Sequence, residues 1–146
     1  MAITAVIRMK GRFSLHPSVK GALQSFGLAT LYSCTLVPDS ASYKGMLQSC
    51  KDVVSFGPVE KESVQLLLTK RGKAADGRRL SVAKKPEEIA KIAQEILAGK
   101  KLSETGVLPV FRLSPPKGGF GSRKYHAPYG PLGKNPGIVA LIASMA

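Results

Sequence analysis

Apolar and polar side chains alternate at the start of the chain. Between residues 3 and 10, one set of alternate positions is apolar, namely Ile3, Ala5, Ile7 and Met9. This period of two predicts a strand with one buried and one wetter face. Residues 17–26 follow the helical spacing instead, with Pro17 suited to the first turn and Gly27 to the stop. They predict a helix of about ten residues.

The same two periods continue as far as Gly72. Residues 31–37 are rich in strand-forming side chains and close at Pro38, which predicts a second strand. Asp39 or Ser40 can cap the next helix, whose apolar face is formed by Tyr43, Met46, Leu47 and Cys50. Residues 53–56 predict a third strand ended by Gly57 and Pro58, and residues 60–71 predict a third helix.

The second half of the chain is less regular. Residues 73–85 are polar and basic, which predicts an exposed linker. Residues 86–98 predict a helix, because Pro86 and two acids stand in its first turn and Gly99 follows its end. Residues 107–113 predict a fourth strand, and Asn135 with Pro136 begins a last helix.

The order of these elements predicts the fold class. Strand, helix, strand, helix and strand follow one another within residues 1–58, which indicates an α/β (α+β) fold with a ferredoxin-like core. The links are too short for parallel crossovers, so we expect a mostly antiparallel three-stranded sheet with its helices on one face. Residues 59–104 then form a helical elaboration with a basic linker, and residues 105–146 form one more strand, a basic extension and a helix, within a single compact unit.

The extension between residues 115 and 137 is the most informative segment. Eleven of its 23 residues are Gly or Pro, it contains no acid, and it mixes cations with rings: Lys117, Phe120, Arg123, Lys124, Tyr125, His126, Tyr129 and Lys134. Cations neutralise phosphates and flat rings stack on bases, so we interpret the segment as an arm that binds nucleic acid. The alternative is a disordered basic tail, but the apolar run at 138–142 behind it argues against disorder.

Charge points to the same class of partner. The 146 residues contain 22 Lys and Arg against 9 Asp and Glu, which gives a net charge of +13 and favours a polyanion, either a nucleic acid or a membrane surface. The longest apolar run, 138–143, is too short to span a membrane, and no export signal precedes the first strand. All the acids lie between Asp39 and Glu104, so we expect the two acid-free ends to meet on one basic face.

Groups that could perform catalysis or hold a metal are sparse. Cys34 and Cys50 have no partner at zinc-ligand spacing, so we expect buried reduced thiols, no metal and no cofactor. His16 stands where it can cap a helix, and His126 lies far from it in the arm, so neither is expected to be a catalytic base. The loop 118–121 lacks the Gly-Lys-Ser/Thr end of a phosphate-binding loop, and we expect no enzyme.

Two further basic clusters have open interpretations. Arg8, Lys10 and Arg12 follow the first strand into a turn, where they either contact RNA or form a solvated strand end. The second cluster either grips phosphates or keeps a linker soluble; it comprises Lys70, Arg71, Lys73, Arg78 and Arg79.

Several strings resemble one known family. They are Cys34-Thr35-Leu36-Val37-Pro38, Tyr43-Lys44-Gly45-Met46, Phe111-Arg112-Leu113-Ser114-Pro115-Pro116 with Gly118-Gly119, and Gly130-Pro131-Leu132-Gly133-Lys134. Together they resemble the large-subunit ribosomal protein family numbered thirty in its archaeal form, which is related to the eukaryotic large-subunit protein seven. The resemblance is weakest over residues 73–103. It implies RNA contacts from Lys10, Arg12, Ser42 and Lys44, and from Arg112 with the arm residues Lys117, Arg123, Lys124, Tyr125, His126 and Lys134.

The function expected from the resemblance is structural. It implies a cytoplasmic constituent of the large ribosomal subunit, present once per ribosome, that binds and stabilises ribosomal RNA beside other ribosomal proteins and has no small-molecule substrate. A free-standing binder of single-stranded or messenger RNA is the alternative, and a small enzyme acting on nucleotides is the third hypothesis.

Overall fold

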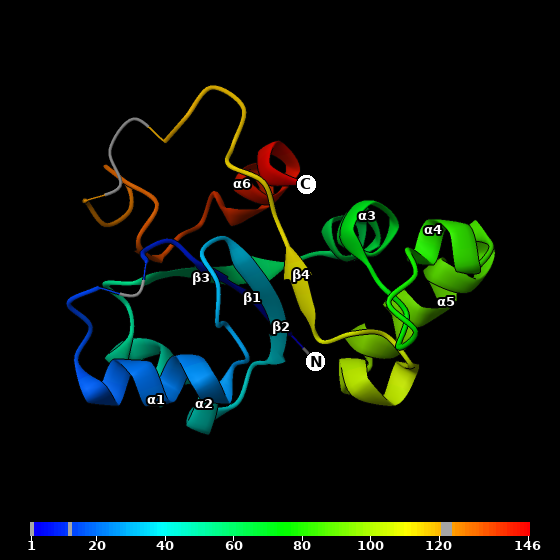
Figure 1. The fold of residues 1–146 in the computed structure, drawn as a ribbon, viewed down its shortest axis with the longest axis horizontal. Helices are drawn as coiled ribbons and strands as arrows, with labels where there is room; N and C mark the ends of the chain where they lie inside the picture. Colours follow the sequence, from blue (N-terminus) through cyan, green and yellow to red (C-terminus); the bar gives the residue numbers. More distant parts are fainter. Residues whose placement is uncertain (1, 12, 121–123) are drawn as a thin grey trace.

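A five-stranded sheet forms the centre of the chain in the computed structural model, which describes residues 2–11, 13–120 and 124–146 (Figure 1). The strands are β1 (Ile3–Arg8), β2 (Ser33–Pro38), β3 (Val54–Val59), β4 (Val110–Arg112) and β5 (Gly133–Lys134). Their order across the sheet is β4-β2-β1-β3-β5, and every pair is antiparallel except β3 with β5. The predicted fold class and antiparallel three-stranded core are confirmed, while the complete sheet is mixed and has two added edges.

Helices cover both faces of the sheet. The helices are α1 (Pro17–Ser25), α2 (Ala41–Ser49), α3 (Lys61–Arg71), α4 (Leu80–Ala83), α5 (Pro86–Leu97) and α6 (Ile138–Met145), with a short 3₁₀ turn η1 (Leu102–Thr105). Figure 1 shows α1 and α2 on one side and the remaining helices on the other. The two helices of the predicted core, α1 and α2, lie on one face as expected, and the helices that follow β3 cover the other face.

The reason lies in β1. Ile3, Ala5 and Ile7 belong to the hydrophobic cluster under α3, α5 and α6, whereas Val6, which points the other way, belongs to the cluster under α1 and α2. On the second face Thr4 is half-buried while Val6 and Arg8 are buried, so the wetter face expected for this strand is largely covered. A central strand that is buried on both faces needs a covering layer on each.

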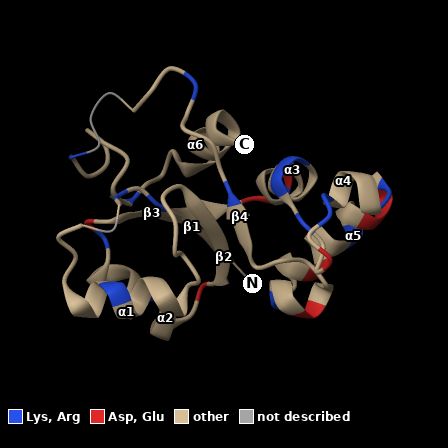
Figure 2. Cartoon of the chain, viewed as in Figure 1, with Lys and Arg blue, Asp and Glu red and all other residues tan. Residues whose placement is uncertain are grey.

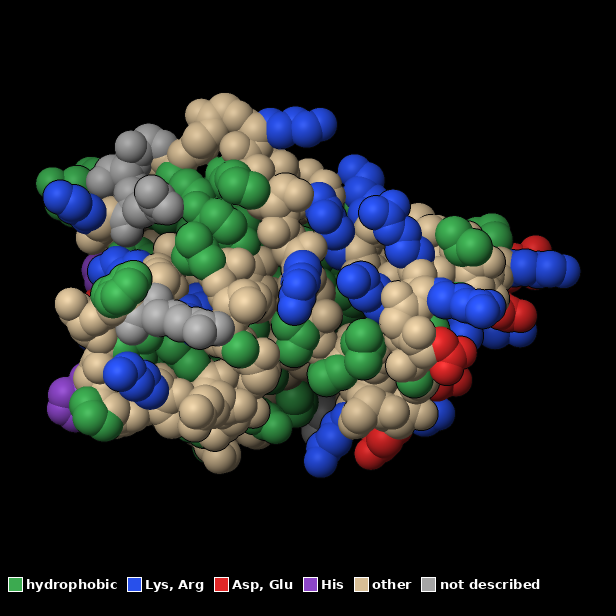
Figure 3. Space-filling view, viewed as in Figure 1, with side chains coloured by type: hydrophobic (Ala, Val, Ile, Leu, Met, Phe, Trp, Pro, Cys, Tyr) green, Lys and Arg blue, Asp and Glu red, His purple; other side chains and the backbone are tan. Residues whose placement is uncertain are grey.

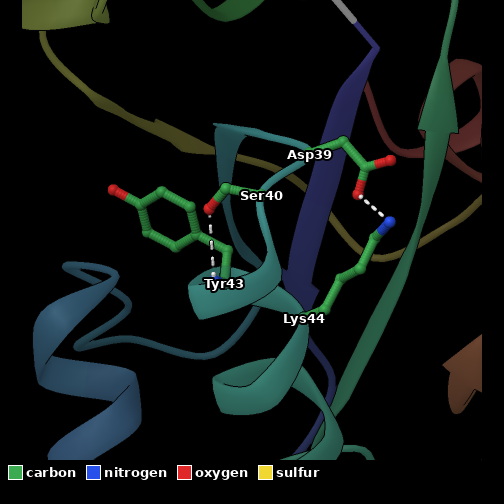
Figure 4. Close-up of polar contacts among 4 residues, drawn as sticks. All are labelled: Asp39, Ser40, Tyr43 and Lys44. Carbon is green, nitrogen blue, oxygen red and sulfur yellow. Dashed lines mark hydrogen bonds and ion pairs between the residues drawn. The ribbon is translucent and has the colours of Figure 1, made fainter.

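The helix starts agree with the sequence analysis. His16 is the N-cap of α1, where its side chain accepts a hydrogen bond from the Ser18 backbone N–H, and Pro17 follows in the first turn. Of the two candidate caps of α2, Ser40 is the one used, and it accepts from the Tyr43 N–H (Figure 4).

Strand β3 is longer than expected. It continues through Gly57 and Pro58 to Val59, although these two residues were predicted to end it. β5 pairs only with Ser55 and Phe56, so β3 is an edge strand at Pro58, where a residue without an N–H is tolerated. At Gly57 a Cβ atom would collide with the backbone oxygen of Asn135, so glycine permits the return segment of the chain to lie against the strand.

The predicted linker after α3 is a folded hairpin. Lys73 pairs with Arg79, Ala74 pairs with Val107, and Leu80 at the start of α4 is completely buried. The polar composition concealed this packing because the backbone and a single leucine anchor the segment. β4 is shorter than predicted, α6 begins at Ile138 rather than at Asn135 or Pro136, and the two-residue β5 was not predicted because two residues show no period.

Candidate nucleic-acid interface

One end of the sheet collects the segments that carry most of the candidate residues. β1 ends there, β3 begins there, and β4 ends opposite the first residue of β2, since Arg112 pairs with Ser33. We use the name arm edge for the β1–α1 turn (residues 9–16), the α2–β3 turn (50–53) and the arm (113–134). The acid-free ends of the chain therefore meet, as predicted, with the middle of the chain contributing Asp52.

Arg8 was a candidate RNA contact, and the structure places it inside the protein. Only 4% of the residue is exposed. Its guanidinium donates to the backbone carbonyls of Leu28 at 2.8 Å, Lys10 at 2.9 Å and Gly11 at 3.2 Å. Arg8 thus holds the β1–α1 turn in shape, while the neighbouring Lys10 is exposed and available to a partner.

The arm is fastened to the protein at both of its stems. At the first, the Ser114 N–H donates to the Met145 carbonyl at 3.0 Å, and the Phe120 ring stacks on Tyr32 with centroids 5.9 Å apart. At the second, Leu132 is 1% exposed, and the Asn135 N–H donates to the Phe56 carbonyl at 2.8 Å. Phe120 is consequently half-buried against protein and is not a free stacking surface, contrary to its interpretation from sequence.

His126 joins the arm to the α2–β3 turn. Its Nε2 lies 2.8 Å from Asp52 Oδ1, and both side chains are substantially exposed. Gly133 has φ +73 and a Cβ there would stand 2.8 Å from His126 Nδ1, so a glycine is needed beside the ring. No sequence signal indicated Asp52, which lies 74 positions away from its partner.

Three aromatic rings project from the arm edge. Tyr125 is 60% exposed, Tyr129 is 86% exposed and Phe13 in the β1–α1 turn is 94% exposed. Unpaired bases are suitable partners for exposed flat rings. The sequence analysis overlooked Phe13, although a large ring within a polar turn after cations was a usable signal.

The arm edge also carries exposed lysines. Lys10, Lys117, Lys124 and Lys134 are all exposed. Arg12 and Arg123, which the sequence also indicated, lie outside the described residues.

Ser42 and Lys44 lie at the opposite end of the sheet. Pro38 pairs with Ile3, so α2 begins beside the start of β1, roughly 17 Å along the strand from its end. Lys44 forms an ion pair with Asp39 at 3.1 Å (Figure 4). An exposed pair of this kind contributes little stability and can yield to a phosphate.

The remaining candidates line a second feature, which we call the basic groove. It has a volume of about 550 Å³, and its lining includes Lys70, Arg71, Lys73, Arg79 and Arg112, with no acid. Figure 2 places these cations around α3, the segment after it and β4, and Figure 3 shows Lys and Arg gathered over the middle of that face. Most of the acids visible in Figure 3 lie towards α4 and α5.

Comparison with known proteins identifies the family. Residues 4–54 match the family model described as Ribosomal protein L30p/L7e. The chain is 40% identical over 136 residues to the large ribosomal subunit protein uL30 of Archaeoglobus fulgidus, which covers 88% of this chain and 90% of that protein. It is 33% identical over 148 residues to the uL30 protein of Methanothrix thermoacetophila, with 97% and 98% covered. The chain belongs to the uL30 family.

Membership confirms the resemblance to the archaeal form and the expectation that the chain is not an enzyme, because uL30 is a structural family. The matched family model runs from β1 to the first residue of β3; it includes the turn 27–30 of the basic groove but stops before the arm and before every cation of the groove. The uL30 protein of Methanothrix thermoacetophila aligns across both. The arm and the groove cations therefore lie outside the segment that the family model describes.

Chemistry other than binding finds little support in this uL30 chain. Within residues 2–11, 13–120 and 124–146 no three His, Cys, Asp or Glu side chains group as a metal site. Cys34 and Cys50 are buried, as expected, and burial raises the pKa of their thiols to about 12 and about 11. No helix in the described part of the chain is long and apolar enough to cross a membrane.

Proposed function

We propose that this uL30 chain is a structural constituent of the large ribosomal subunit that binds and stabilises ribosomal RNA. The observation that carries the proposal is the arm edge, where segments from both ends of the chain expose lysines and three aromatic rings. Lysines neutralise phosphates and rings stack on unpaired bases, and RNA offers both in its loops and bulges.

The proposed contacts form three groups. The arm edge contributes Lys10, Lys117, Lys124, Tyr125, His126 and Lys134; the basic groove contributes Lys70, Arg71 and Arg112; the start of α2 contributes Ser42 and Lys44. Arg12 and Arg123, which lie outside the described residues, stay predicted RNA contacts. Arg8 is left out, because its donors are occupied by backbone carbonyls.

The fold explains how such contacts act together. The arm stems are hydrogen-bonded to the sheet and to α6, so both stems of the arm are fixed to the core before RNA arrives. Contacts that are already ordered lose less conformational entropy on binding. RNA segments that meet this surface are in turn fixed relative to one another, which is how a small protein stabilises a large folded RNA.

The other partners in the proposal are neighbouring ribosomal proteins. Glu87 and Glu88 are exposed on α5 and suit contact with a basic protein better than contact with RNA. We also propose that the protein is present once per ribosome in the cytoplasm and that it has no small-molecule substrate.

Sedimentation tests this function directly. Lysate is fractionated on sucrose gradients at moderate and high salt, and the chain is followed by mass spectrometry beside large-subunit rRNA. We expect comigration with the large subunit at a ratio of one to one. A peak confined to the light fractions would refute the ribosomal assignment and favour a free-standing RNA binder.

A further inference from the structure

The basic groove runs beside the arm edge but differs from it in chemistry. Its walls are the last turn of α3, the hairpin 73–79, the segment 108–112 and the turn 27–30. No aromatic side chain is among its lining residues. The groove therefore offers positive charge without a surface on which a base would stack.

Like charges face each other in this groove. Lys73 and Arg79 are opposite partners in the hairpin bridge, an arrangement that places their Cβ atoms about 5 Å apart and is destabilising for two cations. In the described part of the chain the ion pairs are Lys44–Asp39, Lys100–Glu95 and His126–Asp52, and none of them involves a groove cation. The fold keeps a cluster of mutually repelling cations that an external anion would neutralise.

The groove is also built to hold its shape. The Leu108 N–H donates to the Lys73 carbonyl at 2.9 Å, and the Thr35 hydroxyl donates to the Pro109 carbonyl at 2.9 Å, so the hairpin and the segment before β4 are fixed to each other and to β2. Arg71 donates from Nη2 to the hydroxyl of Ser114, the residue at which the arm begins. This bond orients the guanidinium and links the groove to the arm.

We propose that the basic groove binds a stretch of RNA sugar–phosphate backbone without reading its sequence, as a second subsite for an RNA whose unpaired bases meet the rings of the arm edge. This inference rests on the proposed function and assigns Lys73 and Arg79 as contacts. Lysine and arginine side chains that approach only phosphates position a nucleic acid and carry no base specificity.

Salt dependence of binding tests the groove. The unsubstituted protein is compared with a Lys70→Gln/Lys73→Gln variant and with a Lys85→Gln/Lys91→Gln control. The variant and the control lose the same two positive charges, and all four lysines are exposed. Affinity for deproteinised archaeal large-subunit rRNA is measured at several salt concentrations, with equal melting temperatures as the check on folding. A second variant, Arg79→Gln/Arg112→Gln, repeats the measurement with the guanidinium groups.

We expect the slope of log affinity against log salt to become shallower by about 1.4–1.8 for each groove variant, taking 0.7–0.9 for each of two phosphate contacts, and to stay unchanged for the control. The loss should have the same size on rRNA fragments of different sequence, whereas Tyr125→Leu should weaken binding without changing the slope. Groove variants that match the control would overturn the inference while leaving the proposed function intact. Failure of the unsubstituted protein to bind rRNA would instead overturn the proposed function.

Discussion

Replacing Arg8 and, separately, Lys10 distinguishes a cation that stabilises the fold from a cation that binds RNA. The Arg8→Met change keeps the apolar part of the side chain and removes donors to the backbone carbonyls of Leu28, Lys10 and Gly11. Only the bond to Leu28 is fully buried, and water can replace the donors to the other two carbonyls. Lys10→Met is the matched control, because Lys10 is two residues away and exposed.

The magnitude follows from the buried bond. Loss of a hydrogen bond from a charged donor, with a buried carbonyl left unsatisfied, predicts that Arg8→Met lowers the free energy of unfolding by about 2–4 kcal/mol. For a chain of this length that corresponds to a fall in melting temperature of roughly 5–15 °C. Lys10→Met should change the melting temperature by less than about 2 °C, because exposed substitutions usually have small effects.

Thermal unfolding by circular dichroism and rRNA binding at a temperature where both variants are folded measure the two effects. We expect Arg8→Met to lose stability, and Lys10→Met to lose affinity and make the salt slope shallower by about 0.7–0.9. If Arg8→Met melts like the unsubstituted protein and binds rRNA with a shallower slope, the assignment of Arg8 as a brace of the turn is wrong and the original sequence interpretation is right.

Other predictions concern packing and the buried thiols. Gly57→Ala should destabilise by about 1–3 kcal/mol through its collision with the Asn135 carbonyl, whereas Gly21→Ala, at an open helical position, should be neutral or stabilising; equal melting curves would contradict this contrast. Leu23→Ala should cost about 2–5 kcal/mol in urea unfolding, and a near-zero change would mean that the face assigned to α1 is not buried. Burial raises the pKa of Cys34 from 9.0 to about 12, so the free energy of unfolding should fall as the pH rises above about 9. For the same reason iodoacetamide at pH 8 should label this thiol only after unfolding; rapid labelling of the folded protein, detected by mass spectrometry, would refute its burial.

Local signals in the sequence were sufficient for most of the elements. Pro17 and Ser40 mark helix starts through constraints that act within one turn, and the alternation in residues 3–9 marks a strand regardless of what packs on it. The core fold was predictable for the same reason, because short links leave few ways to arrange three strands and two helices. The mixture of glycine, cations and rings in the arm likewise indicated RNA without any knowledge of its shape.

Expectations from sequence were wrong where contacts with residues far away in the chain decide the local structure. Polar composition indicated a linker at 73–85, but hydrogen bonds to residues 106–108 and the buried Leu80 fold it into the wall of the groove. Phe120 was taken for a free ring because its neighbour Tyr32 lies far away in the sequence. Tertiary contacts of this kind leave no periodic trace.

The sequence by itself determined the helices and strands of the core and the segment that forms the arm, and it predicted a polyanionic partner, since charge, period and turn chemistry act over a few residues. Only the tertiary structure decided which cations are available. Arg8 is buried and its guanidinium donates to backbone carbonyls, so it cannot bind a partner. Folding instead brings Arg112 together with Arg71 and Lys73 in one acid-free groove. Whether a charge is used internally or offered to RNA depends on the atoms around it, and the fold supplies those atoms from every part of the chain.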